Sequence, residues 1–159
     1  MKILVIADTH NVTASIMGQI KKENADMVLF LGDYVQDGEI IKSKLEIPGH
    51  IVAGNGDLAS GYKKEALVRV RDKKILLSHG HNYNVKNSLQ RLYYHGLENK
   101  ADIILFAHTH IPYLKWEGEV LIMNPGSPTF PRGGSNIGTY GIINLGQEVK
   151  AEIVKCHKT

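Results

Sequence analysis

Five short apolar runs recur along the chain, and a cluster of polar residues closes each of them. The runs are rich in β-branched residues and do not alternate with polar positions, which is typical of strands buried on both faces of a sheet. They span residues 3–7, 27–31, 51–53, 75–77 and 103–107. The pattern therefore predicts a sheet that is covered on both sides.

Three amphipathic stretches between these runs predict helices. In residues 12–24, Ile16 and Ile20 stand four positions apart on one helix face, and Thr13 is the candidate N-cap. The second and third stretches are residues 38–45 and 88–100. Because strands and helices alternate, we expect parallel strands joined by crossover helices.

Three hairpin patterns interrupt this alternation. The paired segments are 67–70 with the run at 75, 113–116 with 120–123, and 139–145 with 149–154. Such pairs are antiparallel, so either the sheet is mixed or the chain forms two sheets. No internal repeat, linker or low-complexity segment divides the chain, and we expect one domain over residues 1–159.

The polar residues that close the runs share one position, the carboxyl end of a predicted strand. In open α/β sheets ligands bind outside those ends, so clusters far apart in the sequence can meet at one edge. Five of the eight histidines lie in three such tight clusters. The edge would collect Asp8, His10, Asp33, Asn55, Asp57, His79, His81, His108 and His110.

These residue types indicate a metal site. Imidazole, carboxylate and amide oxygen suit manganese, iron, cobalt, nickel and zinc, and no thiolate lies in the clusters to build an iron–sulfur or closed cysteine site. Asp8 and His10, like His108 and His110, are two residues apart, so in extended backbone both members would point to one side. The candidate ligands exceed what one four-coordinate ion needs. We therefore expect two ions roughly 3.5–4 Å apart that share a carboxylate, the usual arrangement for phosphoester hydrolysis.

Composition narrows the class of protein. The formal net charge is +3, which is too weak to argue for nucleic acid. The first apolar run stops at Asp8, too early for a signal-peptide core, and no run approaches the roughly 18 residues of a membrane span. The single cysteine, Cys156, excludes internal disulfides. We expect a cytoplasmic protein with no membrane partner.

Five motifs follow one another along the chain: Asp8-x-His10, Gly32-Asp33, Gly54-Asn55-x-Asp57, His79-Gly80-His81 and His108-x-His110. Together they resemble the ordered motifs of the calcineurin-like metallophosphoesterases. The short length and the later segment Asn124-Pro125-Gly126-Ser127 resemble the small YfcE-like phosphodiesterases in particular. The resemblance implies two mixed β-sheets packed together and flanked by helices, a four-layer α/β/β/α sandwich with its site at the strand ends.

The resemblance also implies the ligands of two divalent ions. The first ion would take Asp8, His10, Asp33 and His110, and the second would take Asp33, Asn55, His79 and His108, with Asp33 bridging. Manganese is the first expectation, with nickel, cobalt, zinc or iron as alternatives. The two ions would lower the pKa of a bridging water, and the hydroxide so formed would attack phosphorus.

At one position this chain departs from the motif found in many members of that family. They carry a histidine after the motif asparagine, where it protonates the leaving group, whereas this chain has Gly56. Losing such an acid costs about 10²–10⁴-fold when the leaving group is poor, so we predict a preference for diesters with acidic leaving groups. His81 is the candidate replacement acid; the alternative is that His81 is only a polar residue of its loop. Asp57 is expected to brace its own loop through hydrogen bonds. The other histidines lack companions and are expected at the surface or on a helix face: His50, His95 and His157.

The expected activity is metal-dependent hydrolysis of a small phosphodiester. The alternative is a catalytically weak or inactive protein-binding scaffold on the same fold, like the retromer subunit of this superfamily, whose ligand positions are partly altered. A nuclease would use the same chemistry, but the weak charge offers no track for nucleic acid. The family often forms homo-oligomers, so a dimer or tetramer is possible for this chain too.

Overall fold

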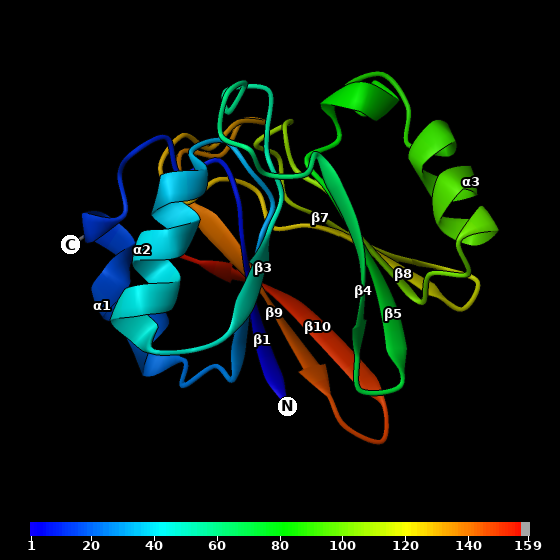
Figure 1. The fold of residues 1–159 in the computed structure, drawn as a ribbon, viewed down its shortest axis with the longest axis horizontal. Helices are drawn as coiled ribbons and strands as arrows, with labels where there is room; N and C mark the ends of the chain where they lie inside the picture. Colours follow the sequence, from blue (N-terminus) through cyan, green and yellow to red (C-terminus); the bar gives the residue numbers. More distant parts are fainter. Residues whose placement is uncertain (157–159) are drawn as a thin grey trace.

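The structure is a computed structural model that describes residues 1–156. Two five-stranded sheets pack face to face (Figure 1). The first has the order β10-β9-β1-β2-β3. Its strands are β1 (Lys2–Ile6), β2 (Met27–Phe30), β3 (Gly49–Ile51), β9 (Thr139–Leu145) and β10 (Val149–Lys155).

The second sheet has the order β4-β5-β6-β8-β7. Its strands are β4 (Glu65–Val70), β5 (Lys73–Ser78), β6 (Ile103–Leu105), β7 (Tyr113–Glu117) and β8 (Val120–Asn124).

Both sheets are mixed, as the family resemblance implied. In the first sheet β1, β2 and β3 are parallel, and β9 joins β1 in antiparallel register. In the second sheet β5, β6 and β8 are parallel. The three predicted hairpins form the antiparallel pairs β4–β5, β7–β8 and β9–β10.

Three apolar layers explain why the runs are continuous rather than alternating. Ile3 and Val5 of β1 face the second sheet and pack into the layer between the sheets. Leu4 and Ile6 point the other way and pack against α1 (Ala14–Lys22) and α2 (Val35–Leu45). A third layer places Leu92 of α3 (Gln90–Glu98) on the outer face of the second sheet. The four-layer α/β/β/α arrangement is thereby confirmed, with α3 on the opposite side from α1 and α2 (Figure 1).

Several predicted boundaries and details were wrong. The third strand occupies 49–51 rather than 51–53, and it is an edge strand whose His50 is exposed. The second helix begins at Val35, three residues before its predicted start. Thr13 is the N-cap of α1, but its own backbone is helical and its hydroxyl makes no capping hydrogen bond.

Two of the histidines outside the motif clusters, His95 and His157, lie away from the site or outside the described residues. His95 lies on α3, where its Nε2 is 2.8 Å from Glu65 Oε1. His157 lies outside the described residues. Within residues 1–156, no helix is both long enough and apolar enough to cross a membrane.

Candidate metal centre

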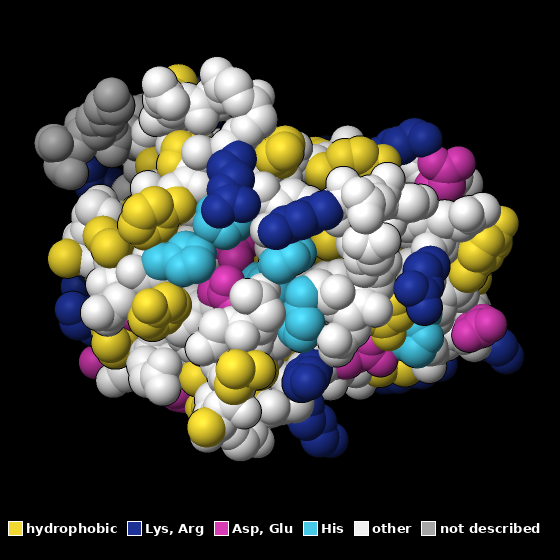
Figure 2. All heavy atoms as spheres, turned by 90° about the horizontal axis from the view of Figure 1, so that it is seen from above, with side chains coloured by type: hydrophobic (Ala, Val, Ile, Leu, Met, Phe, Trp, Pro, Cys, Tyr) yellow, Lys and Arg dark blue, Asp and Glu magenta, His cyan; other side chains and the backbone are white. Residues whose placement is uncertain are grey.

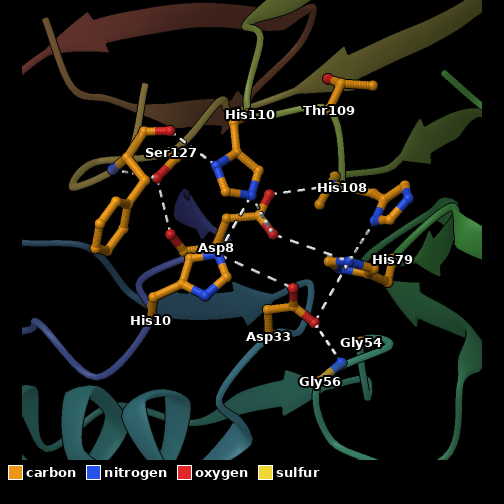
Figure 3. Close-up of polar contacts among 12 residues, drawn as sticks. Asp8, His10, Asp33, Gly54, Gly56, His79, His108, Thr109, His110 and Ser127 are labelled. Carbon is orange, nitrogen blue, oxygen red and sulfur yellow. Dashed lines mark hydrogen bonds and ion pairs between the residues drawn. The ribbon is translucent and has the colours of Figure 1, made fainter. Parts of the chain in front are cut away.

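The motif residues meet in space where the strands of both sheets end (Figure 3). Asp8 follows β1, Asp33 follows β2, and Asn55 lies in the loop after β3. From the second sheet, His79 directly follows β5, and His108 and His110 lie in the loop after β6. All seven implied ligands therefore gather at one edge, four from loops of the first sheet and three from loops of the second. The seven are Asp8, His10, Asp33, Asn55, His79, His108 and His110.

Asp8 lies at the centre of this cluster. Its side chain is fully buried, and its Oδ2 accepts a hydrogen bond from the His108 backbone N–H at 3.1 Å. Its Oδ1 is buried, and no residue between 1 and 156 gives it a hydrogen bond. Burial, followed by the nearby Asp33 carboxylate, raises the pKa of Asp8 well above its usual value. A buried carboxylate oxygen with no donor is costly, and a cation is the partner that it lacks.

Two histidines are fixed so that one ring nitrogen faces Asp8. His79 Nδ1 donates to the Leu31 carbonyl at 2.8 Å, and His110 Nδ1 donates to the Phe130 carbonyl at 2.8 Å. A carbonyl only accepts, so each Nδ1 carries the proton and each Nε2 of a neutral ring keeps its lone pair. Those Nε2 atoms lie 3.9 Å (His79) and 3.5 Å (His110) from Asp8 Oδ1.

Burial keeps these rings neutral. It lowers the pKa of His79 to about 4, and it lowers the pKa of His110 as well. The pKa of His108 also falls to about 4, through burial and the neighbouring His79. Neutral imidazoles are the form that binds metal, so the cluster is set to accept cations at neutral pH.

The candidate ligand atoms form two overlapping groups that share Asp8. One is Asp8, His10 and His110, and the other is Asp8, Asp33 and His79; within each group the ligand atoms lie within 4.8 Å of one another. Asp33, a member of the second group, also faces the first, because its Oδ1 is 3.6 Å from His79 Nε2 and its Oδ2 is 4.0 Å from His10 Nε2. Two oxygens that face two groups are what a bridging carboxylate requires.

Asn55 and His108 complete the side that contains His79. Asn55 Oδ1 and His108 Nδ1 each lie 3.2 Å from His79 Nε2. An amide oxygen facing an imidazole lone pair is a contact between two acceptors, which a cation between them would relieve. The donor set, the orphaned Asp8 oxygen and the neutral rings therefore fit divalent metal ions.

The backbone at these positions differs from what the sequence suggested. We expected the pairs Asp8/His10 and His108/His110 to lie in extended chain, and that was wrong. Both pairs and Asp33 have left-handed backbone, with φ values of 53°, 48°, 52°, 72° and 59° for Asp8, His10, Asp33, His108 and His110. Such a φ costs a non-glycine residue about 1–2 kcal/mol. Strain of this kind gathers at functional sites, where the surrounding fold enforces it.

The loop after β3 approaches Asp33 closely enough to exclude side chains. A Cβ at Gly54 would lie 2.1 Å from Asp33 Oδ1, so only glycine fits there. Gly56 uses its backbone instead, donating its N–H to Asp33 Oδ1 at 2.9 Å. Gly56 therefore helps to orient the Asp33 carboxylate through its backbone N–H, although it has no side chain to donate a proton.

Asp57 holds this loop against the start of α2. Its Oδ1 accepts the backbone N–H groups of Tyr34 (2.9 Å) and Val35 (3.0 Å), and its Oδ2 accepts that of Gly54 (2.8 Å). Tyr34 is the N-cap of α2 and provides no side-chain cap, so Asp57 supplies the missing acceptor.

His81 lies beside the cluster rather than in it. It opens a short 3₁₀ turn, η1 (His81–Tyr83), and its ring centroid is 5.4 Å from that of His79 and 6.2 Å from that of His108. Its Nδ1 is buried and has no hydrogen-bond partner in the part of the chain that the structure describes. Burial, followed by Lys64, lowers the pKa of His81.

Sequence reasoning missed the residues that hold the Asp8–Asn11 turn. Asp37, buried in the first turn of α2, accepts from the Thr9 hydroxyl (2.6 Å) and the Asn11 N–H (2.8 Å). Ser127 Oγ donates to the Asp8 carbonyl at 2.8 Å. Ser127 belonged to a segment singled out by the resemblance, whereas Asp37 gave no signal beyond an acid in a helix.

Charged groups surround the opening of the site. The histidine and carboxylate side chains gather at the middle of one face, with lysine or arginine side chains beside them (Figure 2). Arg132 and Lys86 act on the Asp8 carboxylate, each lowering its pKa, and the Arg132 N–H donates to the His110 carbonyl at 3.1 Å. The face therefore suits a small anion better than a neutral ligand.

Several known proteins are similar to this chain in sequence. The chain is 35% identical over 147 residues to the probable metallophosphoesterase YsnB of Bacillus subtilis, covering 91% of this chain and 85% of that one. It is 24% identical over 169 residues to the phosphodiesterase YfcE of Escherichia coli K12, covering 91% and 88%.

Solved structures match over almost the whole chain. A predicted phosphoesterase from Streptococcus pneumoniae matches with a TM-score of 0.81 at 26% identity, covering 97% of this chain and 88% of that one. Vps29 of Entamoeba histolytica, solved with zinc, matches with a TM-score of 0.80 at 22% identity, covering 99% and 100%, a likeness that shows the fold alone. Residues 1–148 match the calcineurin-like phosphoesterase superfamily domain, so the chain belongs to that superfamily.

Proposed function

We propose that this phosphoesterase-family protein is a divalent-metal-dependent phosphodiesterase that acts on a small phosphodiester. The observation that carries the proposal is the buried, unpartnered Oδ1 of Asp8, which lies between the Nε2 atoms of two neutral histidines, His79 and His110. The name of YfcE supports the diesterase reaction.

The proposed ligand sets are those that the family resemblance implies, with Asp33 as the shared carboxylate. Asp8, His10, Asp33 and His110 would hold one ion, and Asp33, Asn55, His79 and His108 would hold the other. Bound there, two divalent ions would supply the Lewis acidity that lowers the pKa of water and offsets negative charge on a phosphate. Manganese is the first candidate, ahead of nickel, cobalt, zinc and iron.

The residues of this chain set the preferred leaving group. Gly56 has no side chain to donate a proton, and its N–H is already engaged with Asp33. His81 is near enough to be considered as the acid, but its lowered pKa reduces its protonated fraction at neutral pH. We therefore expect faster turnover of diesters whose leaving group departs without protonation.

A binding scaffold is the second candidate. The likeness to Vps29, which is named for vacuolar protein sorting, favours it. The complete set of seven candidate ligands argues for the enzyme instead. Nucleic acid remains an unexpected substrate on charge grounds, and the cytoplasm and a homo-oligomer remain our expectations.

The test is hydrolysis of bis(p-nitrophenyl) phosphate by metal-free protein and by protein with added Mn²⁺, Ni²⁺, Co²⁺ or Zn²⁺. Metal should restore turnover, and Asp33→Ala should lower it at least about a hundredfold, since it removes the proposed bridge. His50→Ala, at an exposed position on β3, is the matched control and should keep full turnover. Turnover that survives thorough chelation, or that Asp33→Ala leaves intact, would contradict the proposal.

A further inference from the structure

Two half-exposed aromatic rings stand at one end of the metal centre. The ring centroid of Tyr34 is 5.6 Å from that of His10, and the ring centroid of Phe130 is 5.2 Å from it, both edge-on. Tyr34 is 42% exposed and Phe130 is 49% exposed. Large apolar surface left open beside polar ligands commonly serves to hold a ligand.

Both rings are fixed by the same contacts that build the centre. The Phe130 carbonyl accepts the His110 Nδ1–H, and the Phe130 N–H donates to Ser127 Oγ at 2.8 Å. Tyr34 follows Asp33 directly, adopts a left-handed φ of 76°, and donates its N–H to Asp57. These contacts fix the backbone from which each ring extends, so both rings start from a defined position beside the centre.

The opposite end of the centre has a different character. Within residues 1–156, the rings of His79 and His108 make ring contacts only with other histidines. Lysines lie on this side, since Lys86 acts on His108 and Lys64 acts on His81. Cationic groups therefore lie near both ends, with Arg132 acting on His110 and the lysines acting on His108 and His81, whereas the rings of Tyr34 and Phe130 contact only the His10 end among the described residues.

We infer that Tyr34 and Phe130 form a binding wall for a planar aromatic group of the substrate, which makes them specificity-determining residues. The substrate class is a phosphodiester with an aryl or heteroaryl ester group at the His10 end and its anionic phosphate at the carboxylate and histidine cluster. The inference rests on the proposed function and narrows its substrate.

The first test is binding and needs no turnover. Calorimetry on the manganese-loaded protein would compare phenylphosphonate, cyclohexylphosphonate and methylphosphonate, which cannot be hydrolysed. We expect phenylphosphonate to bind about tenfold more tightly than methylphosphonate, with the non-planar cyclohexyl compound between them.

Substitutions then assign that preference to the two rings. Phe130→Leu and Tyr34→Leu should each reduce the phenyl-to-methyl affinity ratio about two- to tenfold, as aromatic contacts do. Tyr94→Leu, at a 55% exposed tyrosine on α3, is the matched control and should keep the ratio. An unchanged ratio in whichever ring variant folds like the wild type by circular dichroism would overturn the inference.

The second test separates this inference from the proposed function. Phenyl p-nitrophenyl phosphate and methyl p-nitrophenyl phosphate share one leaving group, so the ratio of their kcat/KM values reports the second ester group. Turnover of both with a flat ratio and equal phosphonate affinities would overturn the aromatic wall and leave the diesterase standing. A phosphonate preference without turnover of either ester would support the wall and reject the diesterase.

Discussion

The two ends of the candidate metal centre use the same residue types in opposite environments. The His79 side chain has no exposed surface, and the Leu31 carbonyl fixes its ring. The His10 side chain is 28% exposed and lies between the rings of Tyr34 and Phe130. The difference shows that ligand chemistry and ligand rigidity are set separately, the first by residue type and the second by burial. We expect the His79 end to hold its ion permanently and the His10 end to respond to substrate.

The largest expected effect comes from removing one histidine at each end. His79→Ala deletes a ligand from the rigid end and leaves a cavity there, so we expect loss of the ion at that end and at least about a hundredfold loss of turnover. His10→Ala should retain one tightly held ion per chain and lose only the second. Metal content after dialysis, measured by atomic emission, checks this. Equal metal loss in the two variants would erase the distinction between the ends.

A smaller effect is expected from the loop that supports the His79 end. Asp57→Ala removes the acceptor of three backbone N–H groups, so we expect the free energy of unfolding to fall by about 2–4 kcal/mol. Urea denaturation measures it. Asp72→Ala, in the exposed β4–β5 turn, is the control and should change stability by less than about 0.5 kcal/mol. If the two variants lose equal stability, Asp57 does not brace the loop.

The smallest expected effect is on the pH dependence of stability and concerns Asp8, whose Oδ1 lies 3.9 Å from His79 Nε2 and 3.5 Å from His110 Nε2. The folded pKa values of His79 and His108 are about 4, below the usual 6.5, so these groups remove stability as the pH falls from about 6.5 to 4. Asp8 acts in the opposite direction, because its raised folded pKa adds stability as the pH falls through it. Metal-free Asp8→Asn should therefore lose stability more steeply than metal-free wild type between pH 6.5 and 4.

The same variant has a second expected outcome. At pH 8, metal-free Asp8→Asn should be more stable than metal-free wild type, because it removes a buried carboxylate whose Oδ1 finds no hydrogen-bond donor among the described residues. Thermal unfolding across pH measures both outcomes. If the stabilities of the two proteins change in parallel with pH, the Asp8 carboxylate is not destabilising in the metal-free protein.

The sequence predicted the layers better than the backbone inside the site. Continuous runs such as 3–7 predict strands covered on both faces because their side chains fill two different cores. The polar clusters predicted which side chains would meet, since strand ends share an edge. The left-handed φ of Asp8 or His110 carries no such signal, because the assembled fold imposes it against local preference. Asp37 escaped notice for a related reason, since its partners lie some 26–28 positions earlier in the chain.

The loops that gather at the site come from both sheets, so metal bound there would affect the stability of the whole fold. Asp8 and Asp33 extend from the first sheet, whereas His79 and His110 extend from the second. Each proposed ion would take ligands from both sheets and so join the two halves of the sandwich, and its binding free energy would become part of the folding free energy. At a free metal concentration a hundred times the dissociation constant, this linkage is worth about 2.7 kcal/mol. The supply of metal would then set how long the folded chain persists, as well as how fast it works.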